Sequence, residues 1–184
     1  MNDYFRRLAT IVRNQHPELS KELSAIPSVT VAVVNLAFKG DNLLKHDAFG
    51  FLVPPLEDKP ILGVIFDSCS FPQDGHTVLT IMMGGKWFSS RFGDSPTENS
   101  LLEIASNEVK KTLGISEKPF CHRVSVLRDC IPQYIVGHHD RVMRIRDYIK
   151  KNKLPLSLVG ASYDGVGVND VIMSAKEGVQ NLSV

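Results

Sequence analysis

Apolar residues recur at a spacing close to 3.6 between residues 3 and 24, which predicts an amphipathic helix over this stretch. Pro17 interrupts the pattern, so we expect either a break or the start of a second helix there. After Pro27 the sequence changes to VTVAVVNLAF, residues 29–38, which is almost wholly apolar and rich in β-branched side chains. A run of that length and composition favours a buried strand over a helix.

Three shorter apolar runs follow, at residues 48–53, 61–66 and 77–83. Turn-forming residues separate them, and residues 70–76, which include Pro, Asp and Gly, suit a hairpin connection between the last two runs. Together with the first run they give four strands joined by short links. That pattern predicts an antiparallel sheet.

Helical periodicity returns in the second half of the chain. Residues 100–113 carry apolar positions on one side, and Gly114 follows, where a left-handed residue often ends a helix. The pattern predicts another strand over residues 121–127 and a helix over residues 139–151. We expect the apolar side of that helix to face the core, and it consists of Val142, Ile145 and Ile149. The other side is interpreted as a solvated basic face, with Arg141, Arg144, Arg146 and Lys150.

The chain closes with a short apolar run, a turn of small residues and a last helical pattern. We expect a strand over residues 154–159, a turn over 160–167 and a helix over 168–182. The helix has one apolar face, made of Val168, Val171, Ile172, Ala175 and Val179.

The turn is the first candidate binding element. Gly160, Gly165 and Gly167 let the main chain approach a ligand closely. The helix that follows begins with unpaired N–H groups and a partial positive charge, which suits an anion or the electron-rich edge of a heterocycle. A plain turn between a strand and a helix uses the same residue types, so both interpretations stay open. The turn is not a dinucleotide fingerprint, because Asp170 stands where GxGxxG needs its third glycine.

Composition removes several function classes. The 184 residues include 21 Lys and Arg against 20 Asp and Glu, a net charge of +1, which gives no argument for binding nucleic acid or an anionic membrane. No apolar run reaches the length of a membrane-spanning helix. The three separated cysteines suit neither a disulfide framework nor a CxxC metal site. Residues 1–15 are basic and amphipathic like a targeting segment, but Asp3 is untypical of one, so we favour a surface helix.

No catalytic motif is found in the sequence. The six histidines have no metal-binding spacing, and we interpret all of them, including His138 and His139, as surface or capping residues. There is no GxSxG elbow and no carboxylate pair, so neither a catalytic residue nor a metal is predicted. The large apolar side chains of the predicted sheet suit either a core or a pocket for a flat ligand. They are Phe49, Phe51, Leu52, Ile65, Phe66, Met82 and Trp87.

Six segments, taken in order, carry a family resemblance. They are VTVAVVNLAFKG, FGFLVPP, ILGVIFDSCSFP, TVLTIMMGGKW, CIPQYIVGH and LPLSLVGASYDGVGVNDVI. From about Leu23 to Leu182 the chain resembles the C-terminal portion of the protoporphyrinogen oxidase family, within the flavin amine oxidase superfamily. Single segments occur in other flavin amine oxidases and desaturases, whereas the ordered set is specific.

The resemblance implies a flavoenzyme of haem biosynthesis. Such an enzyme uses FAD to oxidise protoporphyrinogen IX to protoporphyrin IX, with oxygen as the acceptor and hydrogen peroxide as a product. At the matching positions the flavin is expected to lie against Gly165, Val166, Gly167, Val168 and Asn169. The porphyrinogen is expected to lie against Phe49, Leu52, Ile65 and Ile131.

The implied fold combines α+β and α/β parts. An antiparallel substrate-domain sheet with helices, residues 1–130, would precede the C-terminal strand–turn–helix of an FAD-binding domain, residues 131–184. The family's N-terminal GxGxxG unit is not found in this sequence, so we expect the chain alone to bind FAD poorly and to turn over no substrate. The family also implies peripheral association with the mitochondrial inner membrane and is compatible with a homodimer.

Two alternatives stay open at this point. One is another flavin amine oxidase or a desaturase-type enzyme, which would differ in the pocket residues of the sheet. The other is a non-catalytic protein that binds a porphyrin or pairs with a full-length enzyme.

Overall fold

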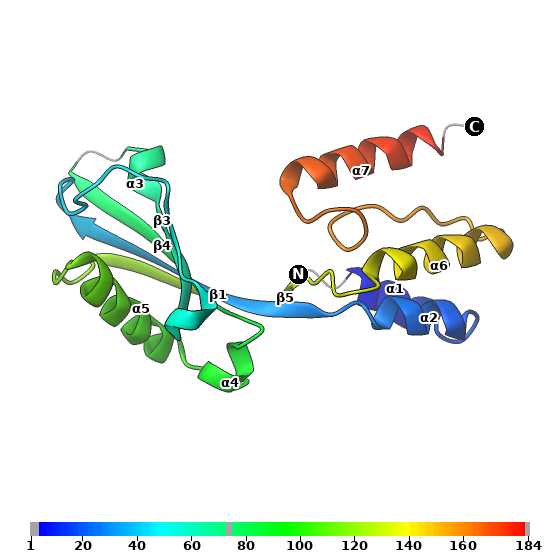
Figure 1. Cartoon of the computed structure of the whole chain (residues 1–184), viewed down its shortest axis with the longest axis horizontal. Coiled ribbons are helices and arrows are strands. Elements are labelled where there is room, and N and C mark those ends of the chain that lie inside the picture. The colour runs from blue at the N-terminus through cyan, green and yellow to red at the C-terminus, as the bar shows by residue number, and fades with distance from the viewer. Residues whose placement is uncertain (1–3, 73–74, 183–184) are drawn as a thin grey trace. The chain divides into compact units, whose positions relative to one another are not determined.

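The computed structural model describes residues 4–72 and 75–182, which form two compact units (Figure 1). The helical unit comprises the residues up to Val29 together with those from Asp129 onward, and the sheet unit comprises Thr30–Arg128. The predicted domain division near residue 130 lies next to one of these boundaries. The boundary at Val29 was not predicted, because the apolar pattern of a single strand runs through it. The assignment of the parts to substrate and FAD domains stays a prediction.

The sheet unit is built on five strands in the order β2-β3-β4-β1-β5. The ladders that join β1 to β4, β4 to β3 and β3 to β2 are antiparallel, which confirms the predicted antiparallel sheet. The strands are β1 (Ser28–Lys39), β2 (Gly50–Leu52), β3 (Ile61–Phe66), β4 (His76–Gly85) and β5 (Cys121–Pro132).

Helix α5 (Glu98–Leu113) covers one face of the sheet (Figure 1). Its N-terminus is capped by Thr97, and it ends at Gly114, whose φ of +76° is the left-handed conformation predicted there. The other elements of this unit are short: α3 (Asp67–Ser70), α4 (Phe88–Phe92) and a 3-10 turn (Pro55–Glu57). Helix α3 begins the connection predicted as a hairpin, and residues 73 and 74 of that connection lie outside the described residues.

Side chains alternate between the two faces of the central strands. Val34, Leu36 and Phe38 of β1 are buried in the core beneath α5, whereas Asn35 between them is half-buried and points the other way. We call the side away from α5 the open face. The half-buried residues that β1, β3 and β4 contribute to it are Val33, Asn35, Ala37, Ile65, Val78, Thr80 and Met82.

The helical unit contains α1 (Tyr4–Val12), α2 (Pro17–Ser24), α6 (His138–Lys151) and α7 (Val168–Gln180). Pro17 is the first residue of α2, so the predicted second start is confirmed. The predicted inner face of α6 is also confirmed, because Val142, Ile145 and Ile149 lie in the core of this unit with Leu19 and Leu23 of α2.

The basic face of α6 also forms ion pairs with a neighbouring helix. Arg141 and Arg144 both form ion pairs with Glu22 of α2, at 3.2 and 3.0 Å. Because these pairs are partly exposed to solvent, they contribute little to folding.

Residues 154–159 form no strand, contrary to the prediction. None of the five strands of the sheet pairs with this segment, and an extended segment needs a neighbouring strand to form a ladder. The apolar composition that suggested a strand is used differently here, because Leu154, Leu156 and Leu158 pack against the core of the helical unit.

Helix α7 turns a different face inward from the one predicted. Ser174 and Gly178 are its buried residues, whereas Val168, Ile172 and Val179 are 76%, 63% and 64% exposed. The small residues decide this orientation. Ser174 Oγ accepts a hydrogen bond from the N–H of Gly160 at 3.1 Å. A Cβ on Gly178 would collide with Cγ1 of Val159, so only glycine permits this approach.

We therefore expect Gly178→Ala to destabilise the protein by about 1–3 kcal/mol, because the added methyl group overpacks the contact with Val159. Urea unfolding of the full chain, followed by circular dichroism, measures the change. Adding Val159→Ala should restore much of the loss, while Lys176→Ala on an exposed part of α7 should have little effect. An unchanged midpoint for Gly178→Ala would contradict this packing of α7.

The described residues contain neither a membrane-spanning helix nor a metal-binding cluster. No helix in that part of the chain is long and apolar enough to cross a membrane. No group of three or more His, Cys, Asp or Glu side chains comes together there in a way that would hold a metal ion.

Candidate functional site

The glycine-rich turn meets helix α7 in a compact junction. Gly167 is the N-cap of α7, and its N–H donates to Oδ2 of Asp170 at 3.2 Å, which confirms the capping role considered for that carboxylate. A Cβ on Gly165 would lie 2.5 Å from Cβ of Asp170, so the side chain of Asp170 folds over a position where only glycine fits.

The five residues expected at the flavin lie together at this junction. Gly165 is half-buried, and Val166, Gly167, Val168 and Asn169 are exposed. The N–H groups in the first turn of a helix have no partner within the helix, and the helix dipole gives this end a partial positive charge. The junction therefore presents N–H donors beside two exposed apolar side chains, which suits the edge of a flat, electron-rich ring.

Two aromatic side chains hold the turn from the side of α6. The hydroxyl of Tyr134 donates to the carbonyl of Ala161 at 2.7 Å, and Nε2 of His138 lies 3.3 Å from the carbonyl of Tyr163. The rings of Tyr134 and His138 stack on each other with centroids 3.8 Å apart and planes 13° from parallel. The turn is thus fixed at two carbonyls by one stacked pair.

Burial shifts the pKa values of these groups. Burial lowers the pKa of His138 from 6.5, an effect that the hydrogen bond to Tyr163 opposes. Burial raises the pKa of the Tyr134 hydroxyl, and a backbone hydrogen bond from Gly165 lowers it in part. Burial raises the pKa of Tyr163 to about 12. At neutral pH all three rings are therefore uncharged.

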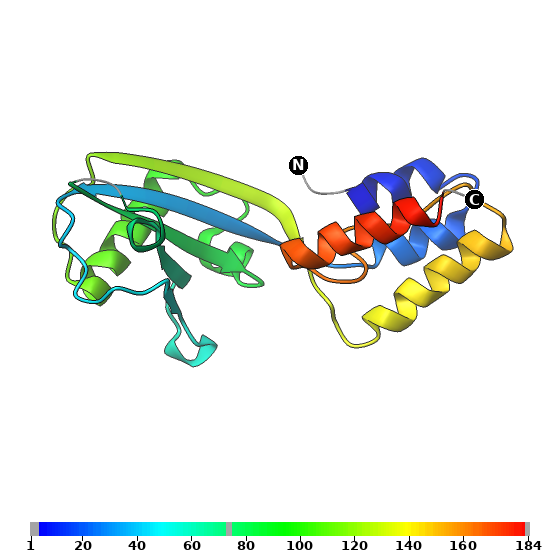
Figure 2. The same ribbon diagram turned by 90° about the horizontal axis from the view of Figure 1, so that it is seen from above.

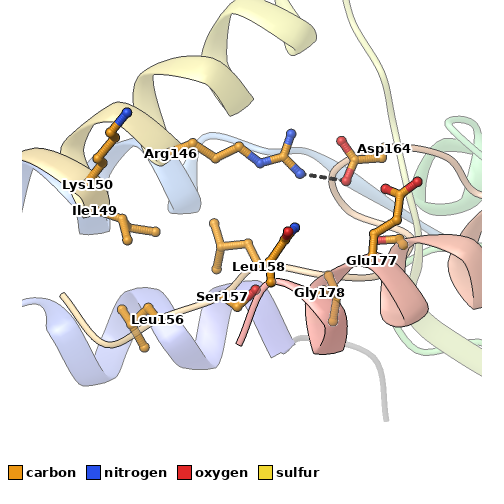
Figure 3. Close-up of a pocket in the computed structure, with 12 residues that line it drawn as sticks. Arg146, Ile149, Lys150, Leu156, Ser157, Leu158, Asp164, Glu177 and Gly178 are labelled. Atoms are coloured by element: carbon orange, nitrogen blue, oxygen red, sulfur yellow. Dashed lines mark hydrogen bonds and ion pairs between the residues drawn. The ribbon is translucent and has the colours of Figure 1, made fainter. Parts of the chain in front are cut away.

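A surface ion pair also reaches the turn. Arg146 of α6 contacts Asp164 at 2.6 Å, as Figure 3 shows. Both side chains are partly exposed, so this pair holds the turn less firmly than the buried contacts do.

The ion pair borders a cavity of about 390 Å³ in the helical unit. Lys150, Glu177 and Asn181 line it together with the segment 156–159, so its charges are of mixed sign (Figure 3). Residues 165–169 are not among its lining residues, so this cavity is not the junction expected to meet the flavin.

The open face of the sheet carries part of the expected porphyrinogen wall. Ile65 is paired with Thr80, and Thr80 with Asn35, in one row across β3, β4 and β1. Nδ2 of Asn35 donates to Oγ1 of Thr80 at 2.7 Å. Leu52 is 78% exposed and lies opposite Gly63, where a Cβ would approach its side chain to 3.0 Å. The face therefore offers an aliphatic surface with one polar pair in it.

The other two residues expected to line the porphyrinogen wall, Phe49 and Ile131, are not among the residues that define the open face. Phe49 is 73% exposed and precedes β2 in the sheet unit. Ile131 is 41% exposed and belongs to the helical unit, together with the turn.

Sequence reasoning missed the role of His138. It was interpreted as a surface or capping residue, but its side chain is 2% exposed, so that interpretation is wrong. The reason is local: Gly137 adopts φ +84°, α6 begins at His138, and this directs the ring inward onto Tyr134. The spacing Tyr-x-x-Gly-His in the segment CIPQYIVGH was the available signal.

Sequence comparison finds relatives over nearly the whole chain, although no family model matches it. Human protoporphyrinogen oxidase is 38% identical over 176 residues, covering 92% of this chain and 37% of its own length. The Schizosaccharomyces pombe protoporphyrinogen oxidase is 32% identical over 93% of this chain and 36% of its own. Bacillus subtilis coproporphyrinogen III oxidase is 26% identical over 94% of this chain and 39% of its own. The chain thus spans less than half the length of these relatives.

Solved structures agree with this result. A protein of Exiguobacterium sp. 255-15, provisionally described as a protoporphyrinogen oxidase, matches 95% of this chain and 39% of its own, with a TM-score of 0.79 and 26% identity. Reduced UDP-galactopyranose mutase matches 92% of this chain and 36% of its own, with a TM-score of 0.67. At 14% identity, that second likeness concerns the fold alone.

Proposed function

This chain is homologous to protoporphyrinogen oxidases over nearly its whole length, and we propose that it forms the flavin-contacting and porphyrinogen-contacting part of such an enzyme. The homology confirms the resemblance carried by the six segments. The observation that supports the proposal most is the junction at residues 165–169, because its geometry suits a flavin and its sequence lies within the homologous stretch.

The residues present fit an FAD. Asp170 fills the space above Gly165 and also accepts from the N–H of Gly167, so the main chain there is held close-packed and open on one side. The N–H groups at the start of α7 would face the ring edge on which negative charge builds. Val166 and Val168 would lie against the ring and keep water from it. When bound, FAD supplies the hydride acceptor that oxygen regenerates, which is chemistry no side chain of the chain offers.

The open face would hold the macrocycle. A porphyrinogen is broad and apolar, with pyrrole N–H donors inside and carboxylates at its rim. Leu52 and Ile65 offer apolar contact, and the amide of Asn35 offers a carbonyl acceptor for a pyrrole N–H. The contribution of these residues would be orientation, since a ring held in one orientation reacts faster than a freely tumbling one.

Protoporphyrinogen is the substrate that we propose, with coproporphyrinogen as the second candidate. The relatives at 38% and 32% identity carry the first activity in their names, and one at 26% carries the second. Peripheral association with the mitochondrial inner membrane and a homodimer belong to the same proposal and rest on the family resemblance alone.

Reconstitution tests this function. The full chain is co-expressed with the part of human protoporphyrinogen oxidase that it does not match, and FAD content and porphyrin fluorescence are measured in air. We expect FAD to co-purify and protoporphyrinogen to be oxidised faster than coproporphyrinogen, with no turnover by the chain alone. A pair that retains FAD but oxidises neither substrate would count against the proposal.

A further inference from the structure

The turn at residues 160–167 does not hold its own shape. It belongs to no helix or strand, and the main-chain hydrogen bond within it joins the N–H of Tyr163 to the carbonyl of Gly160, at 3.2 Å. Its conformation therefore depends on groups supplied by neighbouring elements. Among these groups is the stacked pair of Tyr134 and His138, which precedes and opens α6.

Tyr134 contacts the start of the turn through its hydroxyl group. The hydroxyl donates to the carbonyl of Ala161 at 2.7 Å. Because Ala161 precedes the five residues expected at the flavin in the same turn, this bond anchors the segment that leads into the binding junction.

His138 fixes the middle of the turn and orients Tyr134. Its ring stacks on that of Tyr134, so each limits the rotation of the other. Nε2 lies 3.3 Å from the carbonyl of Tyr163, which requires the proton to be on Nε2. Nδ1 is then a bare nitrogen, and it is buried without a hydrogen-bond partner among the described residues.

A second proton on His138 would have no hydrogen-bond acceptor among the described residues. It would place an N–H on Nδ1, where no acceptor is found in the described part of the chain, and a charge on a side chain that is 2% exposed. The charged and titratable groups around the ring are His139 and Arg141 of α6, which oppose protonation, and Asp164 of the turn, which favours it. Tyr134 and Tyr163 complete the surroundings as neutral rings.

We propose that Tyr134 and His138 are positioning residues for the flavin: the stacked pair holds the turn so that residues 165–169 are in their binding conformation before the cofactor arrives. This role rests on the proposed function of the junction. His138 performs it as a neutral imidazole, so the turn should loosen as the pH falls below 6.5 toward the lowered pKa of the folded protein.

Two measurements on the full chain test this role. Amide hydrogen exchange without flavin reports the order of residues 161–167, and NMR titration with FAD reports affinity. We expect Tyr134→Phe, which keeps the stacked ring but loses the hydroxyl, to speed exchange in the turn about tenfold and to weaken FAD binding by about the same factor. His139→Gln is the matched control, since His139 touches the pair only edge-on, and it should change neither value.

Substitutions of His138 separate positioning from general packing. His138→Gln keeps an N–H donor near the position of Nε2 but does not titrate, whereas His138→Leu loses the donor. We expect His138→Gln to bind FAD within about twofold of the wild type at pH about 7.5 and to lose the weakening that the wild type shows at pH about 5. His138→Leu should be weak at both pH values. A purely structural role would make the two variants equally weak and leave the pH dependence in both.

The outcomes for the two proposals differ. If the wild type binds FAD at the junction but Tyr134→Phe matches it in exchange and affinity, the positioning role is overturned and the proposed function stands. If the wild-type chain, reconstituted with the complementary part of human protoporphyrinogen oxidase, binds no FAD at the junction, the proposed function fails. In that case, faster exchange in Tyr134→Phe would show only that the hydroxyl of Tyr134 orders the turn. The positioning role for the flavin then fails as well.

Discussion

Gly165→Ala is expected to weaken FAD binding about a hundredfold. The added Cβ, an atom that glycine lacks, would lie 2.5 Å from Cβ and 2.6 Å from Cγ of Asp170. Asp170 must then move and give up the hydrogen bond from the N–H of Gly167. Overpacking costs about 1–3 kcal/mol, and loss of a hydrogen bond to a charged group costs about 1.5–3 kcal/mol. Because FAD is expected to bind only the native junction, restoring that conformation costs about 3 kcal/mol at the binding step after partial relaxation, which is about a hundredfold in affinity.

Titration of the isotope-labelled chain, reconstituted with the complementary part of human protoporphyrinogen oxidase, with FAD measures this change through the NMR shifts of residues 165–169. Gly160→Ala is an informative comparison, because a Cβ there meets no atom within 4 Å, although φ of +107° strains any other residue. Gly160→Ala should therefore affect folding more than it affects the junction. Equal FAD affinities for Gly165→Ala and the wild type would contradict the close packing between Gly165 and Asp170 as a requirement for binding.

Ile65→Glu is expected to reduce porphyrinogen binding at least tenfold. Ile65 lies on the open face beside Thr80, where the macrocycle would cover it. A carboxylate buried there without a partner must either stay desolvated or take up a proton, and both states oppose binding. It would also repel the carboxylates at the rim of the substrate.

Anaerobic fluorescence or NMR titration with protoporphyrinogen measures the affinity, and the FAD shifts at residues 165–169 serve as an internal reference. Leu56→Glu is the matched control, since Leu56 is 97% exposed in the 3-10 turn outside the strands. We expect that control to bind both ligands normally. Equal loss in the two variants would mean that added charge, rather than the open face, governs binding.

The strands and most helices could be predicted because their signals are local. Residues 29–38 are too rich in β-branched side chains for a helix, and Pro17 and Gly114 mark helix ends through backbone geometry that no neighbour needs to supply. The expectation that Ile65 and Leu52 line a wall for the porphyrinogen came from the family resemblance and stays a prediction.

Three features of the helical unit could not be predicted from such local signals. The segment 154–159 has the composition of a strand, but a ladder depends on a neighbour that composition does not specify. The orientation of α7 depends on Ser174 and Gly178, a polar residue and one without a side chain, so a hydrophobic pattern points to the wrong face. His138 is buried by a glycine conformation and a stacked ring, which residue type alone does not reveal.

The contact between the flavin and the turn is the most direct test of this account. Intermolecular NOEs between FAD and the isotope-labelled full chain locate the ring on the protein. We expect NOEs from the isoalloxazine to the amides and methyl groups of Val166, Gly167 and Val168. Saturable binding with NOEs confined to the cavity residues Leu158, Ser174 and Glu177, and none at the junction, would contradict it.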